Sequence, residues 1–149
     1  MRDIRFISCE SRDYPEKFKN LPDYPYGIYV KGNLPREDCI SVGMIGARIC
    51  SDYGRAMTKK FAEALSRNNI QIISGMAAGI DAESSLGAIN AGGRTYVVLG
   101  CGVDVIYPTE NVDLYDAILL FLHPCFPASG QDFSLQIFPA PEISFLPYP

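Results

Sequence analysis

Short apolar runs alternate with stretches of helical spacing along the central part of the chain. Residues 40–46 (ISVGMIG) predict a buried strand, and the spacing over residues 54–69 predicts a helix that ends at the Asn-Asn pair. Residues 70–74 and 94–100 predict two further strands, separated by a second helix that starts near residue 79. This β-α-β-α-β order with nearly all-apolar strands predicts an α/β fold, in which helices cover both faces of a mainly parallel sheet.

The segments on either side of this core differ from it in composition. Residues 1–39 form an N-terminal arm that is rich in proline and tyrosine, with a short strand predicted at GIYVKG. The core covers residues 40–118 and closes with a loop and a short helix. Residues 119–149 hold six of the eleven prolines, and their many apolar positions follow neither a helical nor a strand period. We therefore divide the chain into an arm, a core and an atypical apolar tail.

Three glycine-containing loops follow the three predicted strands of the core. The carboxyl ends of parallel strands meet at one edge, so GARICSDYG, SGMAAGID and GCGVDVIYP should converge on one site. In the first loop Gly46 permits a sharp turn, and Arg48 precedes a helix that Ser51 or Asp52 can cap. Arginine and free helix amides suit a phosphate, although a plain strand-to-helix turn with a surface arginine explains them too.

Several other polar residues near these loops have two interpretations. Asp81, in the first turn of the second helix, either caps that helix or orients Arg48 across the cleft. Tyr107 either stacks on a base or packs internally, and Arg94 is either a second phosphate contact or a charge at a strand edge. The residues expected to shape the loops are Asp81, Gly100, Gly102, Tyr107 and Pro108.

Composition narrows the chemistry that this site can perform. The net charge is −4, but residues 111–149 carry four acidic and no basic side chains, so the acidity does not exclude a nucleic acid bound in a locally positive pocket. Five cysteines without a CxxC pair and a single histidine provide neither a metal-ligand set nor a catalytic triad. We therefore expect no metal, no cofactor and no enzyme activity, with loops built for binding.

The chain also carries no sign of a membrane or an export signal. No run approaches 18 uninterrupted apolar residues, and the start of the chain, MRDIRFISCE, is charged throughout. These features predict a cytoplasmic protein without a membrane span.

Several motifs in a row resemble one known family. YPEKFKNLPDYPYGIYVKGNL, VGMIGARICSDYG, IISGMAAGIDAESSLGAI, GGRTYVVLGCGVDVIYPTEN and LYDAI occur in the order and spacing typical of the DNA-processing protein A (DprA, or Smf) family. The resemblance covers about residues 14–118 and implies a Rossmann-like, three-layer α/β/α domain that binds single-stranded DNA. It also implies a homodimer that protects incoming strands and loads the RecA recombinase onto them in natural transformation, without catalytic turnover.

The same resemblance assigns DNA-contacting positions residue by residue. The family's glycine-serine-arginine loop falls on residues 46–48, with alanine here in place of the usual serine, and the basic position of its GGxT element falls on Arg94. The residues expected to bind DNA or phosphate are Gly46, Ala47, Arg48, Ser51, Tyr53, Gly54, Ser74, Gly75, Met76, Ala77, Gly79 and Arg94.

The chain departs from the family pattern in two places. Ser84 and Ser85 stand where the family usually has Ala-His. After LYDAI, the tail lacks the family's next strand, proline-rich loop and arginine-asparagine-arginine segment. We hypothesise that the tail arose from a reading-frame change or a degraded gene end, which would leave the C-terminal part of the sheet incomplete and alter the dimer surface. The alternative is a lineage-specific tail that packs on the sheet edge.

Two competing functions remain beside DNA binding. One is a nucleotide-cleaving hydrolase of the lysine-decarboxylase-like type, although GGRTYVV lacks the acid of that family's GGxGTxxE stretch. The other is an inactive fragment of a once larger protein.

Overall fold

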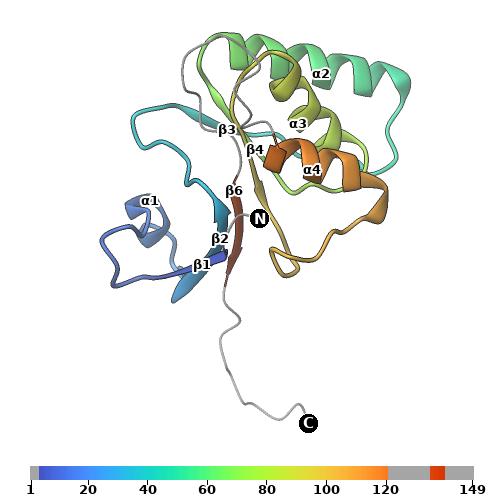
Figure 1. Ribbon diagram of the computed structural model, residues 1–149. Helices are drawn as coiled ribbons and strands as arrows, with labels where there is room; N and C mark the ends of the chain where they lie inside the picture. Colours follow the sequence, from blue (N-terminus) through green and yellow to red (C-terminus); the bar gives the residue numbers. More distant parts are fainter. Residues whose placement is uncertain (1–3, 121–134, 140–149) are drawn as a thin grey trace.

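A computed structural model describes residues 4–120 and 135–139 of the chain (Figure 1). Over these ranges, no helix combines the length and the apolar character needed to cross a membrane. The elements in chain order are β1 (Ile4–Ser8), α1 (Glu16–Lys19), β2 (Gly27–Gly32), β3 (Ser41–Gly43), α2 (Asp52–Arg67), β4 (Gln71–Ser74), α3 (Ile80–Asn90), β5 (Thr95–Val98), a 3-10 turn η1 (Thr109–Asn111), α4 (Val112–Leu120) and β6 (Leu135–Pro139).

One mixed sheet organises these elements. The described strands form a six-stranded sheet in the order β1-β2-β6-β5-β4-β3. The four strands from β3 to β6 are parallel, whereas β2 pairs antiparallel with both β6 and β1. The predicted α/β fold with a mainly parallel, Rossmann-like sheet is therefore confirmed.

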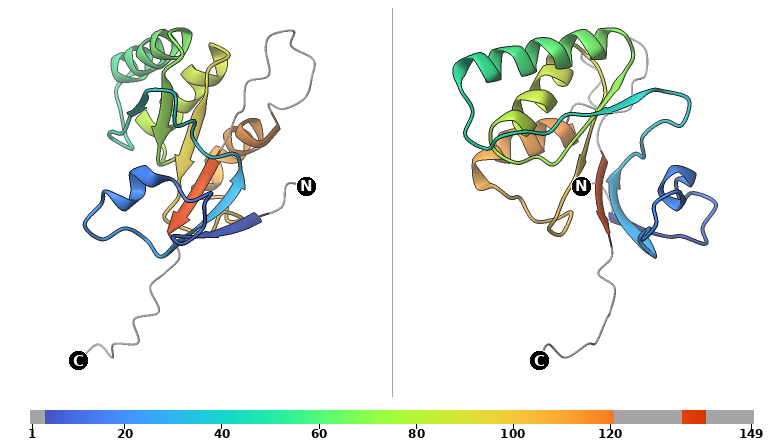
Figure 2. Two further views of the ribbon diagram at one scale, coloured as in Figure 1. Left: turned by 90° about the vertical axis from the view of Figure 1, so that its left-hand side faces the viewer. Right: turned by 180° about the vertical axis from the view of Figure 1, so that it is seen from behind.

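The two faces of the sheet carry different layers. Helices α2, α3 and α4 lie on one face, and the N-terminal arm with α1 lies on the other (Figures 1 and 2). The side chains of β5 alternate between these faces, as the pleat of a strand requires. Val97 packs with Met76 and Leu114 on the helical side, whereas Tyr96 packs with Ile28 on the side of the arm.

A close helix–helix contact completes the helical layer. Ala62 of α2, Ile72 of β4 and Ala88 of α3 form one buried cluster. Gly87 makes this approach possible, because a Cβ atom at Gly87 would lie 2.8 Å from the carbonyl oxygen of Lys59. Small residues on α2 and α3 thus hold both helices tightly over β4.

Two strands differ from the sequence-based expectation. The arm contributes β1 as well as the predicted β2, and both belong to the sheet rather than lying over a core. The tail, to which we assigned no regular structure, completes α4 at residues 119–120 and forms β6 between β2 and β5 (Figure 2). The expected motif-free tail is thus corrected at these residues, while the rest of it, residues 121–134 and 140–149, lies outside the described residues.

The buried cluster under α2 and α3 should dominate stability. Ile72 is 0% exposed and Ile40 is 69% exposed, so the two offer a matched pair of isoleucines. We expect Ile72→Ala to lower the free energy of unfolding by about 2–5 kcal/mol, because it leaves a cavity among α2, α3 and the sheet. Ile40→Ala should change it by less than about 0.5 kcal/mol. Urea unfolding of both variants measures the difference, and equal effects would contradict this description of the core.

Candidate nucleic-acid interface

Three loops meet beyond the carboxyl ends of β3, β4 and β5 and form a pocket of about 500 Å³. The predicted convergence of these loops on one site is thereby confirmed. The pocket is lined by Arg48 from the first loop, by Gly75, Ala77 and Ala78 from the second, and by Leu99, Gly100, Cys101, Tyr107 and Pro108 from the third. Among the sequence-predicted residues, the structure therefore gathers Arg48, Gly75, Ala77, Gly100, Tyr107 and Pro108 around one cavity.

Asp81 joins the first two loops from below. Its carboxylate accepts a hydrogen bond from the Gly46 amide at 3.2 Å and another from the Gly75 amide at 3.1 Å, and the residue is only 6% exposed. It therefore has neither of the two roles that we considered. The N-cap of α3 is Gly79 without a side-chain cap, and Asp81 forms no ion pair with Arg48 within the described residues.

The backbone of the second loop packs directly on that of the first. Gly79 has a positive φ of 80°, and a Cβ atom there would overlap the carbonyl oxygens of Ala47 and Arg48. The neighbouring Ile80 amide donates to the Ala47 carbonyl at 3.2 Å. Gly46 is equally constrained, since a Cβ atom there would lie 2.9 Å from the Ile80 side chain. The path of the backbone at Arg48 is thus set by close contacts that only glycine permits.

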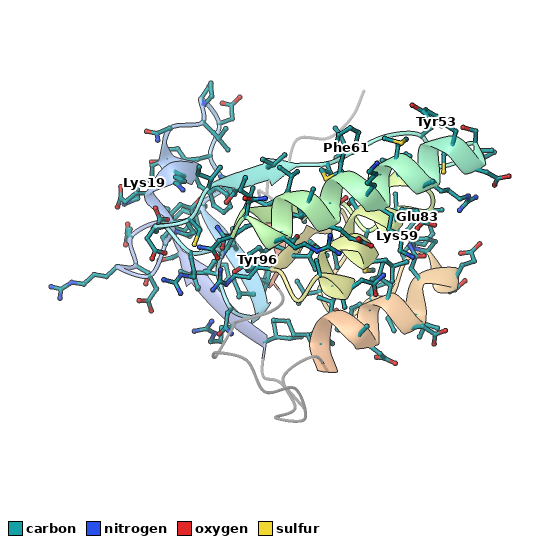
Figure 3. All side chains as sticks on the ribbon, turned by 90° about the horizontal axis from the view of Figure 1, so that it is seen from above. Lys19, Tyr53, Lys59, Phe61, Glu83 and Tyr96 are labelled. Atoms are coloured by element: carbon teal, nitrogen blue, oxygen red, sulfur yellow. The ribbon has the colours of Figure 1, made fainter. Side chains whose placement is uncertain are left out.

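The start of α2 presents a mixture of internal and outward-facing groups. Ser51, and not Asp52, is the N-cap, and its hydroxyl accepts from the Gly54 amide at 3.2 Å. Tyr53 projects from the first turn and is 75% exposed (Figure 3). The Ser51 hydroxyl is therefore engaged within the helix, whereas the Tyr53 ring is free to meet a ligand.

Two predicted contact residues turn out to be internal. The Ser74 hydroxyl donates to the Met44 carbonyl at 2.7 Å and is buried, so it links β4 to the segment after β3. The Met76 side chain is fully buried in the core cluster below the pocket, with a positive backbone φ of 57°. We correct the expectation for both side chains, because neither is available to a ligand.

Arg94 lies away from the pocket altogether. It precedes β5, so it sits at the amino end of the parallel strands, whereas the pocket lies at their carboxyl end. Its Nη1 atom donates to the Asn69 side-chain oxygen at 2.7 Å, and the residue is buried. The structure therefore does not bring Arg94 together with Arg48 in one phosphate-binding groove.

Sequence reasoning missed one residue that supports the pocket. The Asn111 side chain donates to the Met76 carbonyl at 2.8 Å and so ties the turn η1 to the second loop. Of the loop-shaping glycines, Gly100 lines the pocket, while Gly102 stands against the Asp104 carboxylate. Asn111 lies in the quoted stretch YPTEN, but an isolated asparagine in a turn gives no signal that it contacts a distant carbonyl.

The charges at the pocket come from few side chains. Arg48 is exposed, carries no ion pair within the described residues, and is the one charged residue among those lining the cavity. Nearby, Arg55 of α2 pairs with Glu83 of α3 at 3.5 Å and joins the two helices. Within residues 4–120 and 135–139, no group of three metal-ligating side chains gathers here or elsewhere.

Fold and pocket together define a Rossmann-like domain with a glycine-lined site that can hold an anion at the carboxyl edge of its sheet. The profile of the family described as DNA recombination-mediator protein A matches residues 5–122. The chain belongs to this family.

Curated relatives and solved structures agree with this assignment. The chain is 36% identical to protein Smf from Synechocystis over 121 residues, which cover 78% of this chain and 30% of that protein. It resembles the X-ray structure of DNA processing protein A from Streptococcus pneumoniae with a TM-score of 0.76 and 30% identity, over 92% of this chain and 44% of that one. It also resembles DNA processing protein A from Helicobacter pylori, a structure described for its single-stranded DNA binding mode, with a TM-score of 0.68 and 26% identity, over 99% of this chain and 61% of that one. The chain thus spans less than two thirds of each of these relatives.

The Asp81 carboxylate should be needed for a stable pocket. Asp81→Asn leaves one oxygen to accept one amide and turns an NH₂ donor toward the other, so we expect the free energy of unfolding to fall by about 1–3 kcal/mol. The exposed Asp13 provides the control, since Asp13→Asn makes the same chemical change without a buried partner. Urea unfolding should separate the two variants, and an Asp81→Asn protein as stable as Asp13→Asn would refute this role.

Proposed function

We propose that this chain binds single-stranded DNA through the pocket formed by its three loops. The observation that carries the proposal is the unpaired, exposed Arg48 at the mouth of a pocket whose walls are largely backbone and small side chains. A guanidinium can hold a phosphate oxygen pair in a bidentate grip. The family assignment and the single-stranded DNA binding of the Helicobacter pylori relative support the same conclusion.

The chemistry of the pocket suits a strand bound without regard to its sequence. Arg48 would hold a phosphate, and the close approach of the backbone at Gly75 and Gly100 would leave room for the sugar-phosphate chain. The ring of Tyr107 lines the pocket and is 62% exposed, so it can stack on an unpaired base. Such contacts follow the backbone and use the π-face that all bases share.

The arrangement favours binding over hydrolysis. A nucleotide-cleaving enzyme needs an acid or a base within hydrogen-bond reach of the reacting atoms. None of the residues lining the pocket is a carboxylate or a histidine, and the nearby Asp81 carboxylate is directed to two backbone amides. These observations support a DNA-binding protein rather than a hydrolase.

We also propose that the chain acts as its relatives' family name implies, in recombination. It would protect incoming strands during natural transformation and pass them to the RecA recombinase, as a homodimer. Light scattering across micromolar concentrations would test the dimer, and strand exchange by RecA on protein-coated DNA would test the transfer. A monomer without effect on RecA would restrict the function to DNA binding alone.

Arg48 should determine the affinity for DNA. We expect Arg48→Ala to weaken binding of labelled oligo-dT about tenfold or more and to reduce the salt dependence by about one phosphate contact. Arg12→Ala removes the same charge from an exposed position of the arm and serves as the control. Fluorescence anisotropy over a salt series measures both quantities. Equal affinities of the two variants would exclude Arg48 as the phosphate contact, and no binding by the wild type up to tens of micromolar would favour an inactive fragment.

Tyr107 should contribute by stacking on a base. Because a base stacked on an aromatic ring gains about 1–3 kcal/mol, Tyr107→Ala should weaken oligo-dT binding by about five- to 150-fold. Tyr107→Phe keeps the ring and should bind within about twofold of the wild type, which separates stacking from hydrogen bonding by the hydroxyl. If both variants lose the same affinity, the ring does not stack.

A further inference from the structure

A second and smaller pocket lies at the opposite edge of the sheet. It has a volume of about 90 Å³ and lies between the end of α2 and the start of β5. Its lining residues are Ser66, Arg67, Asn69, Ile70, Gly93 and Arg94. The volume is several times the roughly 10–15 Å³ that one water molecule needs, and Arg67 and Asn69 are exposed at its rim. We call it the Arg94 pocket.

Arg94 brings a buried positive charge to this pocket without a negative partner. The residue is 8% exposed, and its Nη1 atom donates to the neutral Asn69 side chain at 2.7 Å and contacts the Cys39 sulfur at 3.9 Å. It forms no ion pair with any carboxylate of the described residues, and its Nε atom has no hydrogen-bond partner there. Buried charges in proteins are normally paired, because an uncompensated one is costly to remove from water.

Ser66 adds a second buried group that lacks a partner. Its hydroxyl is buried without a hydrogen bond among the described residues, and the residue is 6% exposed. Gly93 makes room for it, since a Cβ atom at Gly93 would overlap the Ser66 side chain. The pocket thus brings together two unused donors, the Arg94 Nε–H and the Ser66 O–H, and a full positive charge.

We propose that the Arg94 pocket binds a small oxyanion of the phosphate class. An oxyanion supplies the acceptors that both unused donors lack and the negative charge that the Arg94 guanidinium lacks. Water molecules could accept the two hydrogen bonds, but they would leave the charge uncompensated. Arg67 at the rim adds a second positive charge, although its side chain also pairs with Glu63 at 3.1 Å. The phosphate group is either free or part of a nucleic-acid backbone.

The Arg94 pocket is separate from the proposed DNA site. Five residues of extended chain lie between Arg94 and Leu99, which corresponds to roughly 16 Å at about 3.3 Å per residue. One phosphate cannot reach both arginines. The two sites can therefore be tested independently, and either proposal can fail without the other.

The test measures thermal stability of the full chain in increasing inorganic phosphate. Because phosphate could also occupy the first pocket, the starting protein is Arg48→Ala. We expect its Tm to rise by about 3 °C or more at saturating phosphate, and Arg48→Ala/Arg94→Met to lose this response. General salt effects of phosphate on burial act equally on both proteins. An equal rise in the two proteins, or no rise in Arg48→Ala, overturns the proposal and leaves the DNA site untouched.

Ser66→Ala guards against a variant that fails to fold. In the Arg48→Ala background it removes one donor and no charge, so we expect about tenfold weaker phosphate binding by calorimetry, with unchanged stability in phosphate-free buffer. Undiminished affinity would overturn the role of Ser66 and with it the proposed site. In the wild type, weaker oligo-dT binding on Arg94→Met identifies the phosphate as that of DNA. Unchanged oligo-dT binding together with the Tm response identifies it as free phosphate.

Discussion

The candidate site depends on one carboxylate that is turned away from it. Asp81 accepts hydrogen bonds from the amides of Gly46 and Gly75, which belong to loops that follow two neighbouring strands. Backbone donors buried beneath a pocket need an acceptor, and a carboxylate has two oxygens to offer them. The loops are thereby held at a fixed separation before any ligand arrives, and this pre-organisation lowers the cost of binding.

Around this link, the backbone does most of the positioning and few side chains remain for the ligand. Gly79 and Gly46 let the second loop lie directly on the first, and Asn111 anchors the turn behind them. Arg48 and Tyr107 are the groups left with exposed, functional ends. Rigid walls with two free side chains suit a ligand that repeats the same phosphate and the same aromatic face along its length.

The order of core elements and the meeting of the three loops could be predicted from the sequence, because both follow from apolar periodicity and parallel topology. The role of Asp81 could not, since a carboxylate in a first helical turn looks like a cap whether or not it caps. Arg94 was misplaced because resemblance assigns residues to a motif without saying at which end of a strand they lie. β6 escaped notice because a strand hydrogen-bonded on both sides needs no periodic pattern of its own.

The position of β6 has a consequence for how the chain acquires its structure. Residues 135–139 pair with β2, near the start of the chain, and with β5 on the other side. Hydrogen bonds between segments so far apart in sequence raise the contact order, and chains rich in such pairings fold slowly. During synthesis, the arm and the helical core wait as two open edges until the last strand emerges from the ribosome. Over that interval, chaperones that cover unpaired strand edges would protect the nascent chain from aggregation.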